Sequence, residues 1–292
     1  MQIDCIKFIE DVRSQQDLTE KAKLVIVQVG DDSRSNAYIR SKVKESEKWN
    51  IDVQVIKTDE NIRTDELCGY IYDLNHSRDV DGIILQLPLP KHIDEEKVIN
   101  FIDERKNVDG FKQFGIKSKY FEPCTPKGII MLLDSLTDLD GKFVTLIGRG
   151  KTVGEPLRDM LLAKNCTLSI AHSHTRKEEL ELLLSYSDVI ISAVGKPDLF
   201  SFSVIKHNAI VIDAGISIVD GKQVGDFSHK YIDMWEESVS YTPWTKGVGK
   251  LTVMALMLNV RKAHELMKKN KKELKNYELH ETSCSNVGCG IR

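Results

Sequence analysis

Short apolar runs alternate with amphipathic stretches along the first half of the chain. Apolar runs at residues 23–29, 53–57 and 81–86 each have the length of a buried strand. Between these runs lie segments whose apolar residues are spaced as on one face of a helix, most clearly over residues 65–74. Strands that alternate with helices are typical of a parallel sheet covered by helices. This half of the chain is therefore predicted to form an α/β domain.

The same alternation resumes after two closely spaced prolines, Pro123 and Pro126, which favour a domain boundary at this point. An apolar helix is predicted over residues 128–136. A long amphipathic helix over residues 252–268 is expected to pack back against the first domain. Between these two helices, further strands are predicted at residues 142–147, 167–171, 189–193 and 209–213.

Polar residues in the first domain gather where a parallel sheet would bind a ligand. Ser35, Tyr38 and Lys42 are offset by three and then four residues, so they share one face of a helix. Gln86 ends an apolar strand, and Asp109 stands in a Val-Asp-Gly-Phe sequence. Open parallel sheets bind ligands at the carboxyl ends of their strands. We therefore expect Tyr38, Lys42, Gln86 and Asp109 to line one cleft.

A glycine-rich turn at residues 148–156 follows the first strand of the second domain and opens a helix. Free amides at a helix amino end can hold a pyrophosphate, so this context favours a dinucleotide. The turn departs from the standard fingerprint, because Val153 stands where the third glycine falls and Gly154 follows it. A turn without a cofactor therefore stays open as the alternative.

The end of the next strand indicates which dinucleotide is preferred. An NAD site places a carboxylate there for the ribose hydroxyls, and His172, Ser173 and His174 stand there instead. Arg149, Ser173 and Arg176 are available to a 2′-phosphate. NADP is therefore favoured over NAD.

Composition limits the class of protein further. The 292 residues carry a net charge of -3, which gives no basic field for nucleic acid. The six cysteines lack zinc or disulfide spacing, so we expect reduced thiols and no metal site. No apolar run is long enough to span a membrane, and residues 1–7 lack the layout of a secretory signal. We expect a cytoplasmic protein that binds neither membranes nor nucleic acid.

Several motifs, in one order, resemble the methylenetetrahydrofolate dehydrogenase/cyclohydrolase family. The similarity runs from about residue 22 to residue 265, and several motifs in register are far more specific than one glycine turn. The motifs lie at residues 29–42, 80–90, 108–111, 123–128, 148–156 and 193–197.

The resemblance implies NADP-dependent oxidation of 5,10-methylenetetrahydrofolate to the methenyl form, and hydrolysis of that form to 10-formyltetrahydrofolate. By resemblance, Lys42 exchanges protons during hydrolysis and Gln86 orients its amine. Tyr38 stacks on the flat folate, and Asp109 accepts hydrogen bonds from the pterin. These four residues are the predicted catalytic set. The predicted substrate-binding set is Tyr38, Gln86, Leu87, Pro88, Asp109 and Gly249.

The resemblance also implies a cofactor site and an assembly. The family pairs into homodimers through its cofactor domains, so a homodimer is expected. Tetrahydrofolate derivatives are the expected small-molecule partners. The predicted NADP-binding residues are Thr125, Gly148, Arg149, Gly150, Val153, Gly154, His172, Ser173, Ala193, Gly195 and Thr252.

The chain departs from the family pattern in three places. Residues 243–252 read Pro-Trp-Thr-Lys-Gly-Val-Gly-Lys-Leu-Thr where relatives have Pro-Val-Pro-Gly-Gly-Val-Gly-Pro-Met-Thr. Trp244 and Lys246 would narrow the folate pocket, change its charge or favour an oligoglutamate tail, and these alternatives stay open. Gly150 replaces the serine that usually follows Gly-Arg, and Lys-Gln replaces His-Pro after Phe111.

The predicted fold is α/β, with an N-terminal substrate domain, a Rossmann-like dinucleotide-binding domain and a cleft between them. Residues 1–122 form the folate-binding domain, which a helix over about residues 252–275 completes, and residues 123–251 form the NADP-binding domain. A disordered tail is expected over residues 276–292. Two alternatives remain: a divergent paralogue that binds folate or dinucleotide without turnover, and a dehydrogenase that lacks cyclohydrolase activity.

Overall fold

The computed structural model describes residues 1–111, 118–230 and 238–285. The chain divides into two compact units. Unit 1 consists mainly of Met1–Asp17 and Glu122–Leu256, and unit 2 mainly of Leu18–Gln113 and Met257–Arg292. The first 17 residues thus group with unit 1, whereas the sequence places them in the folate-binding domain. A parallel bridge between Gln2 and Tyr241 holds this segment in unit 1.

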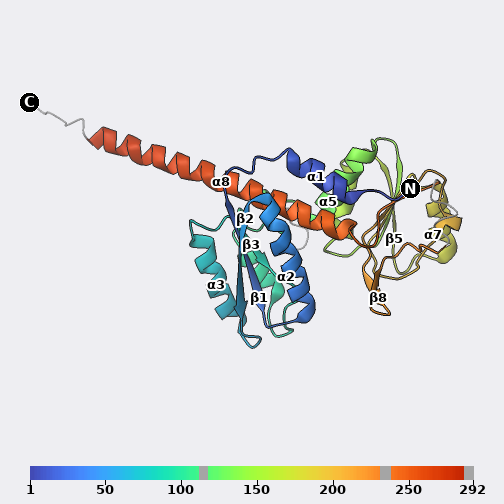
Figure 1. The fold of residues 1–292 in the computed structure, drawn as a ribbon, viewed down its shortest axis with the longest axis horizontal. Helices are drawn as coiled ribbons and strands as arrows, with labels where there is room; N and C mark the ends of the chain where they lie inside the picture. Colours follow the sequence, from blue (N-terminus) through green and yellow to red (C-terminus); the bar gives the residue numbers. More distant parts are fainter. Residues whose placement is uncertain (112–117, 231–237, 286–292) are drawn as a thin grey trace, which may run out of the picture. The chain divides into compact units, whose positions relative to one another are not determined.

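Unit 2 contains a three-stranded parallel sheet of order β2-β1-β3 (Figure 1). The predicted strands and helices of this unit are confirmed. The additional short helix α4 has only seven residues, too few for a clear periodic pattern. The elements are β1 (Ala22–Val29), α2 (Ser33–Ser46), η1 (Glu47–Trp49), β2 (Ile51–Thr58), α3 (Thr64–His76), β3 (Gly82–Leu85) and α4 (Glu95–Phe101).

The core of unit 2 forms because β1 is apolar on both faces, as expected of a central parallel strand. Val25 and Val27 are fully buried, and they pack in one cluster with Leu67 and Ile71 of α3. The α2 helix begins where the Asp32 carboxylate accepts a hydrogen bond from the amide of Ser35, at 2.8 Å. This cap sets the start of the helix that carries Tyr38 and Lys42.

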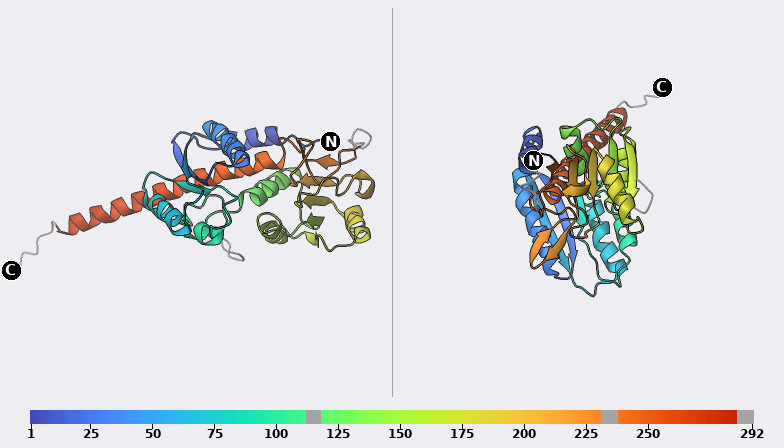
Figure 2. Two further views of the ribbon diagram at one scale, coloured as in Figure 1. Left: turned by 90° about the horizontal axis from the view of Figure 1, so that it is seen from below. Right: turned by 90° about the vertical axis from the view of Figure 1, so that its right-hand side faces the viewer.

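Unit 1 contains a five-stranded parallel sheet of order β10-β7-β6-β4-β5 and a separate hairpin of β8 and β9. Figure 2 shows the chain path through this unit from two further directions, with the N-terminal segment in blue and residues 122–256 in green to orange. The elements are α1 (Cys5–Ser14), α5 (Cys124–Leu136), β4 (Phe143–Ile147), α6 (Gly154–Leu162), β5 (Thr167–Ala171), α7 (Lys177–Tyr186), β6 (Val189–Ser192), η2 (Phe202–Val204), β7 (Ile210–Asp213), β8 (Ser217–Val219), β9 (Lys222–Val224) and β10 (Ser240–Tyr241).

The strand order of unit 1 creates a topological switch point at β4. The chain passes from β4 to β5 on one side and then to β6 on the other side of β4. In a doubly wound sheet, the loops that leave strands at such a point diverge and leave a crevice for a dinucleotide. The turns after β4 and β6 therefore border this crevice.

The last helix, α8 (Val248–Ser285), is longer than the sequence predicts. Its residues up to Leu256 belong to unit 1, and its residues from Met257 belong to unit 2. The tail expected to be disordered from residue 276 is helical as far as Ser285, because the good helix formers Lys-Lys-Glu-Leu-Lys at residues 271–275 lead into it and Glu278, Leu279 and Glu281 continue the pattern. The rest of that tail, residues 286–292, lies outside the described residues.

Candidate active site

Unit 2 brings Lys42 and Gln86 together, although they are 44 residues apart in the sequence. The amine of Lys42, on α2, donates a hydrogen bond of 3.0 Å to the side-chain oxygen of Gln86. The side-chain nitrogen of Gln86 donates to the carbonyl of Leu87 at 2.7 Å, so the amide is oriented with its oxygen toward Lys42. Gln86 is buried just beyond the carboxyl end of β3. The pair thus lies at the end of the sheet where ligands bind.

Tyr38 lies on the same helix as Lys42, one turn earlier, and 53% of its surface is exposed. An exposed ring beside a half-buried amine is available to stack on a flat ligand. Leu87 is half-buried and Pro88 is exposed, and both directly follow Gln86. These residues therefore continue the same surface.

Asp109 lies in a tight turn beside β3. A parallel bridge joins Ile83 to Asn107, and the amide of Gly110 then donates to the carbonyl of Asn107 at 3.2 Å. The carbonyl of Val108, the residue before Asp109, accepts a 2.9 Å hydrogen bond from the fully buried side chain of Asn259. Asn259 is a supporting residue that the sequence does not single out, because only the folded chain places α8 beside this turn.

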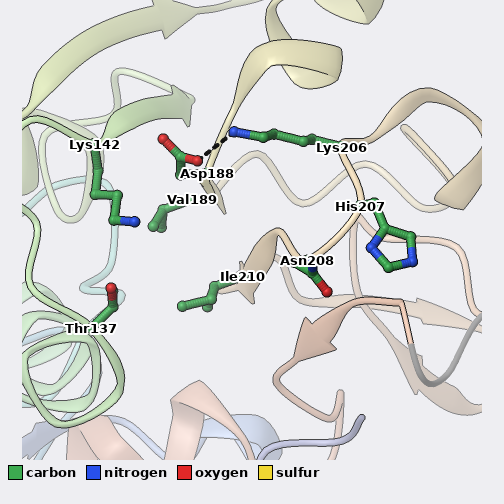
Figure 3. Close-up of a pocket in the computed structure, with 8 residues that line it drawn as sticks. All are labelled: Thr137, Lys142, Asp188, Val189, Lys206, His207, Asn208 and Ile210. Atoms are coloured by element: carbon green, nitrogen blue, oxygen red, sulfur yellow. Dashed lines mark hydrogen bonds and ion pairs between the residues drawn. The ribbon is translucent and has the colours of Figure 1, made fainter.

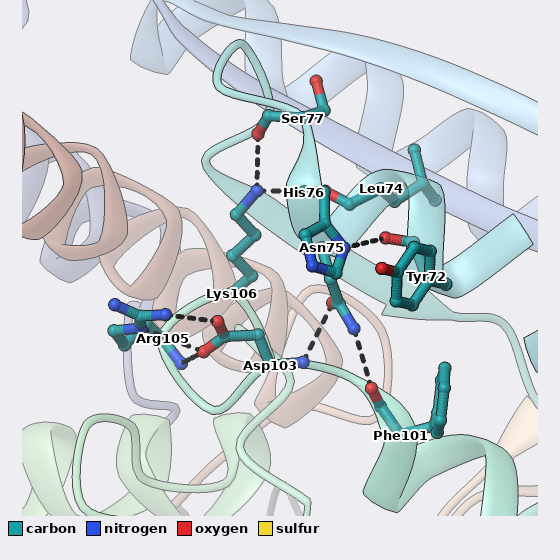
Figure 4. Close-up of polar contacts among 9 residues, drawn as sticks. All are labelled: Tyr72, Leu74, Asn75, His76, Ser77, Phe101, Asp103, Arg105 and Lys106. Carbon is teal, nitrogen blue, oxygen red and sulfur yellow. Dashed lines mark hydrogen bonds and ion pairs between the residues drawn. The ribbon is translucent and has the colours of Figure 1, made fainter.

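A polar network holds the approach to this turn (Figure 4). The buried amine of Lys106 donates to the carbonyls of Leu74 and Ser77, at 2.9 and 2.6 Å, at the carboxyl end of α3. The side chain of Asn75 accepts from the amide of Asp103 at 2.9 Å and donates to the carbonyl of Phe101 at 2.8 Å. The segment that leads to Asp109 is therefore tied to α3 at several points.

The glycine turn of unit 1 has the geometry of a dinucleotide cradle. It connects β4 to α6, which begins at Gly154. A Cβ on Gly154 would lie 2.4 Å from the carbonyl oxygen of Gly148, and a Cβ on Gly148 would lie 2.7 Å from the carbonyl oxygen of Ala193. Gly148 also has a φ of +111°, which L side chains rarely adopt. Gly148 and Gly154 thus allow a tight turn with α6 packed close to β4, and Gly150, where an added Cβ would meet nothing within 4 Å, leaves the backbone open to a pyrophosphate, so the turn fits the cofactor.

The turn after β5 is closed by its own residues. The amide of Thr175 donates to the carbonyl of His172 at 2.8 Å, and the hydroxyl of Thr175 accepts from the amide of His172 at 2.9 Å. Ser173 lies within this turn, and Arg176 forms an ion pair with Glu179. Arg149 thus lies two residues beyond the end of β4, and His172 and Ser173 directly follow the end of β5.

Two predicted cofactor residues that are 127 positions apart meet in unit 1. The hydroxyls of Thr125, at the start of α5, and Thr252, on α8, are 2.9 Å apart. Gly249 is exposed in the first turn of α8, and a Cβ added to it would meet nothing within 4 Å. Gly150 likewise is open to solvent in the glycine turn.

The indole of Trp244 packs inside unit 1. It stacks on the imidazole of His229 with ring centroids 3.9 Å apart and an angle of 11° between the planes. The indole nitrogen donates to the carbonyl of Phe227 at 3.1 Å, and the side chain of Gln223 donates to the backbone carbonyl of Trp244 at 2.9 Å. Trp244 therefore ties the loop before α8 to residues 223–229, a role that the sequence does not suggest.

A polar pocket lies at the opposite end of the unit 1 sheet from the glycine turn (Figure 3). Lys142 and Asp188, which line it, directly precede β4 and β6. Asp188 accepts from Lys206 at 2.6 Å and from the amide of Phe143 at 2.9 Å. Because parallel sheets bind ligands at carboxyl ends, this amino-end pocket is separate from the candidate site.

The two units together define a class of protein. Unit 1 is a doubly wound domain whose glycine turn lies at the switch point, and unit 2 presents an amine held by an amide at the end of its own parallel sheet. The class is that of the dinucleotide-binding α/β enzymes. In the part of the chain that the structure describes, no helix has the length and apolar character needed to cross a membrane.

The chain belongs to the tetrahydrofolate dehydrogenase/cyclohydrolase family. Residues 4–109 match the family's catalytic domain, and residues 123–268 match its NAD(P)-binding domain. This confirms the resemblance seen in the sequence motifs and the α/β fold with two domains.

Individual relatives agree. The bifunctional protein FolD of Hydrogenobaculum is 41% identical over 256 residues, which cover 85% of this chain and 91% of that protein. The crystal structure of the bifunctional FolD of Campylobacter jejuni has a TM-score of 0.82 at 33% identity, covering 92% of this chain and 99% of that one. The Trypanosoma brucei enzyme, solved with NADP and an inhibitor, has a TM-score of 0.81 at 25% identity over 92% of this chain and 98% of that one.

Proposed function

We propose that this protein oxidises 5,10-methylenetetrahydrofolate to the methenyl form with NADP and then hydrolyses the methenyl form to 10-formyltetrahydrofolate. The observation that carries the proposal is the hydrogen bond between Lys42 and Gln86 within the segment that matches the family's catalytic domain. In the same chain, the glycine turn lies within the segment that matches the NAD(P)-binding domain. The two activities thus have separate chemical requirements and separate sets of residues.

The oxidation requires alignment more than acid–base chemistry. The one-carbon unit lies between two nitrogens, so loss of hydride leaves a cation that both nitrogens stabilise, and no general base is needed. NADP, when bound, supplies the hydride acceptor. The turns after β4, β5 and β6 hold the dinucleotide. Hydride transfer is then favoured because the one-carbon unit and the nicotinamide are held in the right orientation.

The hydrolysis requires proton movement, because water must add to the cation and a nitrogen must leave. We assign this proton movement to Lys42. Gln86 holds the amine in place, since its own amide is locked by the hydrogen bond to Leu87. An amine on a helix, directed by a buried amide, is the kind of preorganised group that general acid–base catalysis uses.

The substrate is a flat, charged pterin derivative, and unit 2 offers groups that suit it. We assign stacking on the pterin to Tyr38, whose ring is exposed. We assign acceptance of hydrogen bonds from the pterin amino and ring nitrogens to Asp109, because a carboxylate is a strong acceptor. The supports from Asn259 and Lys106 keep the segment around Asp109 in one conformation.

NADP is the proposed dinucleotide. The Trypanosoma brucei relative was solved with NADP, and no carboxylate follows β5 in this chain. Arg149 and Ser173 are the residues we assign to the 2′-phosphate. A cytoplasmic location and a homodimer formed through unit 1 remain predictions from the family resemblance.

An assay of the purified protein tests the proposal. We expect NADP to be reduced only when methylenetetrahydrofolate is present, and we expect added methenyltetrahydrofolate to be hydrolysed without any dinucleotide. If neither NADP nor NAD is reduced at saturating folate, the dehydrogenase is excluded and a non-catalytic paralogue is favoured. If NADP is reduced and methenyltetrahydrofolate accumulates, the protein is a dehydrogenase without cyclohydrolase activity.

A further inference from the structure

The buried carboxylate of Asp226 lies between three backbone segments of unit 1, and neither the sequence motifs nor the proposed reaction assigns it a role. Asp226 is fully buried and follows the β8–β9 hairpin. One of its oxygens accepts from the hydroxyl of Ser192 at 2.6 Å and from the amide of Val194 at 2.9 Å. The other oxygen accepts from the amide of Lys196 at 2.7 Å. One side chain thus accepts from three donors, one at the end of β6 and two in the turn that follows it.

The backbone of Asp226 is itself held firmly. The carboxylate of Asp213, at the end of β7, accepts from the amides of Asp226 and Phe227 at 3.1 and 2.9 Å. The amide of Leu199 donates to the carbonyl of Asp226 at 2.8 Å. A Cβ on Gly215 would lie 2.1 Å from the Asp226 carboxylate, so the carboxylate lies directly against that backbone. Asp226 therefore has little freedom to move.

The turn that Asp226 holds faces the dinucleotide cradle. Residues 193–196 leave β6, and the carbonyl of Ala193 lies against Gly148 of the glycine turn. Gly195 has a φ of +70°, and its carbonyl accepts from the hydroxyl of Ser217 at 2.9 Å. The crevice at the switch point thus has one wall made by the turn after β4 and another made by the turn that Asp226 organises.

We propose that Asp226 is the positioning residue for the 193–196 turn and that it thereby sets the affinity of unit 1 for NADP; this rests on the proposed function. Bonds from backbone donors to a carboxylate are stronger than bonds between neutral groups. Loss of the carboxylate leaves buried amides unpaired, so the turn shifts to find other partners. Asp226 acts through the turn and does not touch the reacting atoms.

The bifunctional reaction offers an internal control for Asp226→Asn. The side-chain amide places a donor where the turn supplies only donors, so we expect the dissociation constant for NADP to rise at least about tenfold, which is about 1.4 kcal/mol. Hydrolysis of methenyltetrahydrofolate requires no dinucleotide and is assigned to unit 2. Because substitutions at distant sites usually act independently, the rate of hydrolysis should stay within about twofold of wild type. A loss that comes only from unfolding would lower both activities together.

A matched variant at the other end of the same strand separates positioning from stability. Asp188 directly precedes β6 and also accepts a backbone amide and one side-chain donor, but at the amino end of the sheet. Asp188→Asn should lower the melting temperature of the cofactor-free protein and leave NADP affinity unchanged. Ser192→Ala removes one bond to Asp226 and keeps its charge, so it provides a milder variant if Asp226→Asn fails to fold.

The readouts distinguish the outcomes. NADP binding is measured by titration calorimetry, and amide hydrogen exchange is followed at Val194 and Lys196 in the cofactor-free protein. The proposal expects faster exchange at these amides and weaker NADP binding in Asp226→Asn, and smaller changes in the same direction in Ser192→Ala. It is overturned if Asp226→Asn, or Ser192→Ala in its place, binds NADP as Asp188→Asn does. If wild type itself fails to reduce NADP with methylenetetrahydrofolate, the proposed function fails instead.

Discussion

At the scale of single residues, the amine of Lys42 is the group on which the hydrolytic chemistry depends. Its hydrogen bond to Gln86 directs it, and Gln86 is held in turn by the carbonyl of Leu87. The sequence identifies Lys42 and Gln86 as candidates, because each has a recognisable local context. That they meet at 3.0 Å is a property of the folded sheet.

Lys42→Met tests this assignment. We expect hydrolysis of methenyltetrahydrofolate to fall by about 10²- to 10⁴-fold, the usual contribution of a general acid–base group, while NADP reduction continues. The measurement is the decay of methenyl absorbance beside the appearance of NADPH. Lys44→Met, an exposed lysine on the same helix, is the matched control and should hydrolyse like wild type. Unchanged hydrolysis in Lys42→Met would remove this residue from the mechanism.

Two titratable groups of unit 1, the buried Asp213 and the half-buried His229, have opposite effects on stability in acid. Burial lowers the pKa of His229, stacked on Trp244, to about 4. Burial also raises the pKa of Asp213 to about 6, and the nearby Asp226 adds to the rise. Below its usual pKa of 6.5, His229 binds a proton more readily in the unfolded chain, so its contribution to stability is lost as the pH falls from 6.5 to 4. Asp213 binds its proton more readily in the folded state, so its contribution grows in the same direction as the pH falls below 6.

His229→Phe keeps an aromatic ring against Trp244 and removes the titration. Between pH 7.5 and pH 5 we expect the variant to lose about 2 kcal/mol less stability than wild type, from the linkage of the His229 pKa. Urea unfolding of both proteins at the two pH values measures the difference. Equal losses in the two proteins would show that His229 does not control acid stability.

At the scale of elements, the glycine turn between β4 and α6 depends on close backbone contact. A Cβ on Gly154 would lie 2.4 Å from the carbonyl oxygen of Gly148 and 2.8 Å from the Cα of Arg149. Neither neighbour is the end of a flexible side chain, so the turn itself must move. The pattern of glycines in the sequence identifies this turn, and the departure at Val153 does not prevent it from forming.

Gly154→Ala is therefore expected to weaken NADP binding by about tenfold or more, the equivalent of about 1.4 kcal/mol. Gly69→Ala is the matched substitution, because Gly69 lies inside α3 and an added Cβ meets nothing within 4 Å. That variant should bind NADP normally and gain about 0.5–1 kcal/mol of stability from the better helix former. Binding titrations and urea unfolding check both expectations. Normal NADP affinity in Gly154→Ala would exclude the turn from the site.

The short strands β8, β9 and β10, which the sequence misses, share a physical reason. The strands with long apolar runs, such as β1 and β4, are predicted to within a residue or two, because burial on both faces leaves a plain pattern. The β8–β9 hairpin is short and exposed, and β10 has two residues, so neither carries such a pattern. The hairpin nevertheless leads directly to Asp226.

At the scale of the whole molecule, NADP is expected to stabilise the protein because it binds only the folded state. At a free concentration one hundred times its dissociation constant, NADP should add about 2.7 kcal/mol to the free energy of unfolding of unit 1. NAD at the same concentration should add less, since it lacks the phosphate that we assign to Arg149 and Ser173. Urea unfolding with each dinucleotide measures both. An equal effect of NAD would contradict the NADP preference.

The sequence by itself determines the α/β class, most strands and the main candidate residues, since burial and turn chemistry leave local patterns in the order of residues. The tertiary structure alone decides which distant groups meet: Lys42 with Gln86, Thr125 with Thr252, Asn259 with Val108, and Asp226 with the turn after β6. It also turns Trp244 onto His229. Contacts of this kind depend on strand order and on the path of the chain between elements, and no local pattern of hydrophobic and polar positions encodes them.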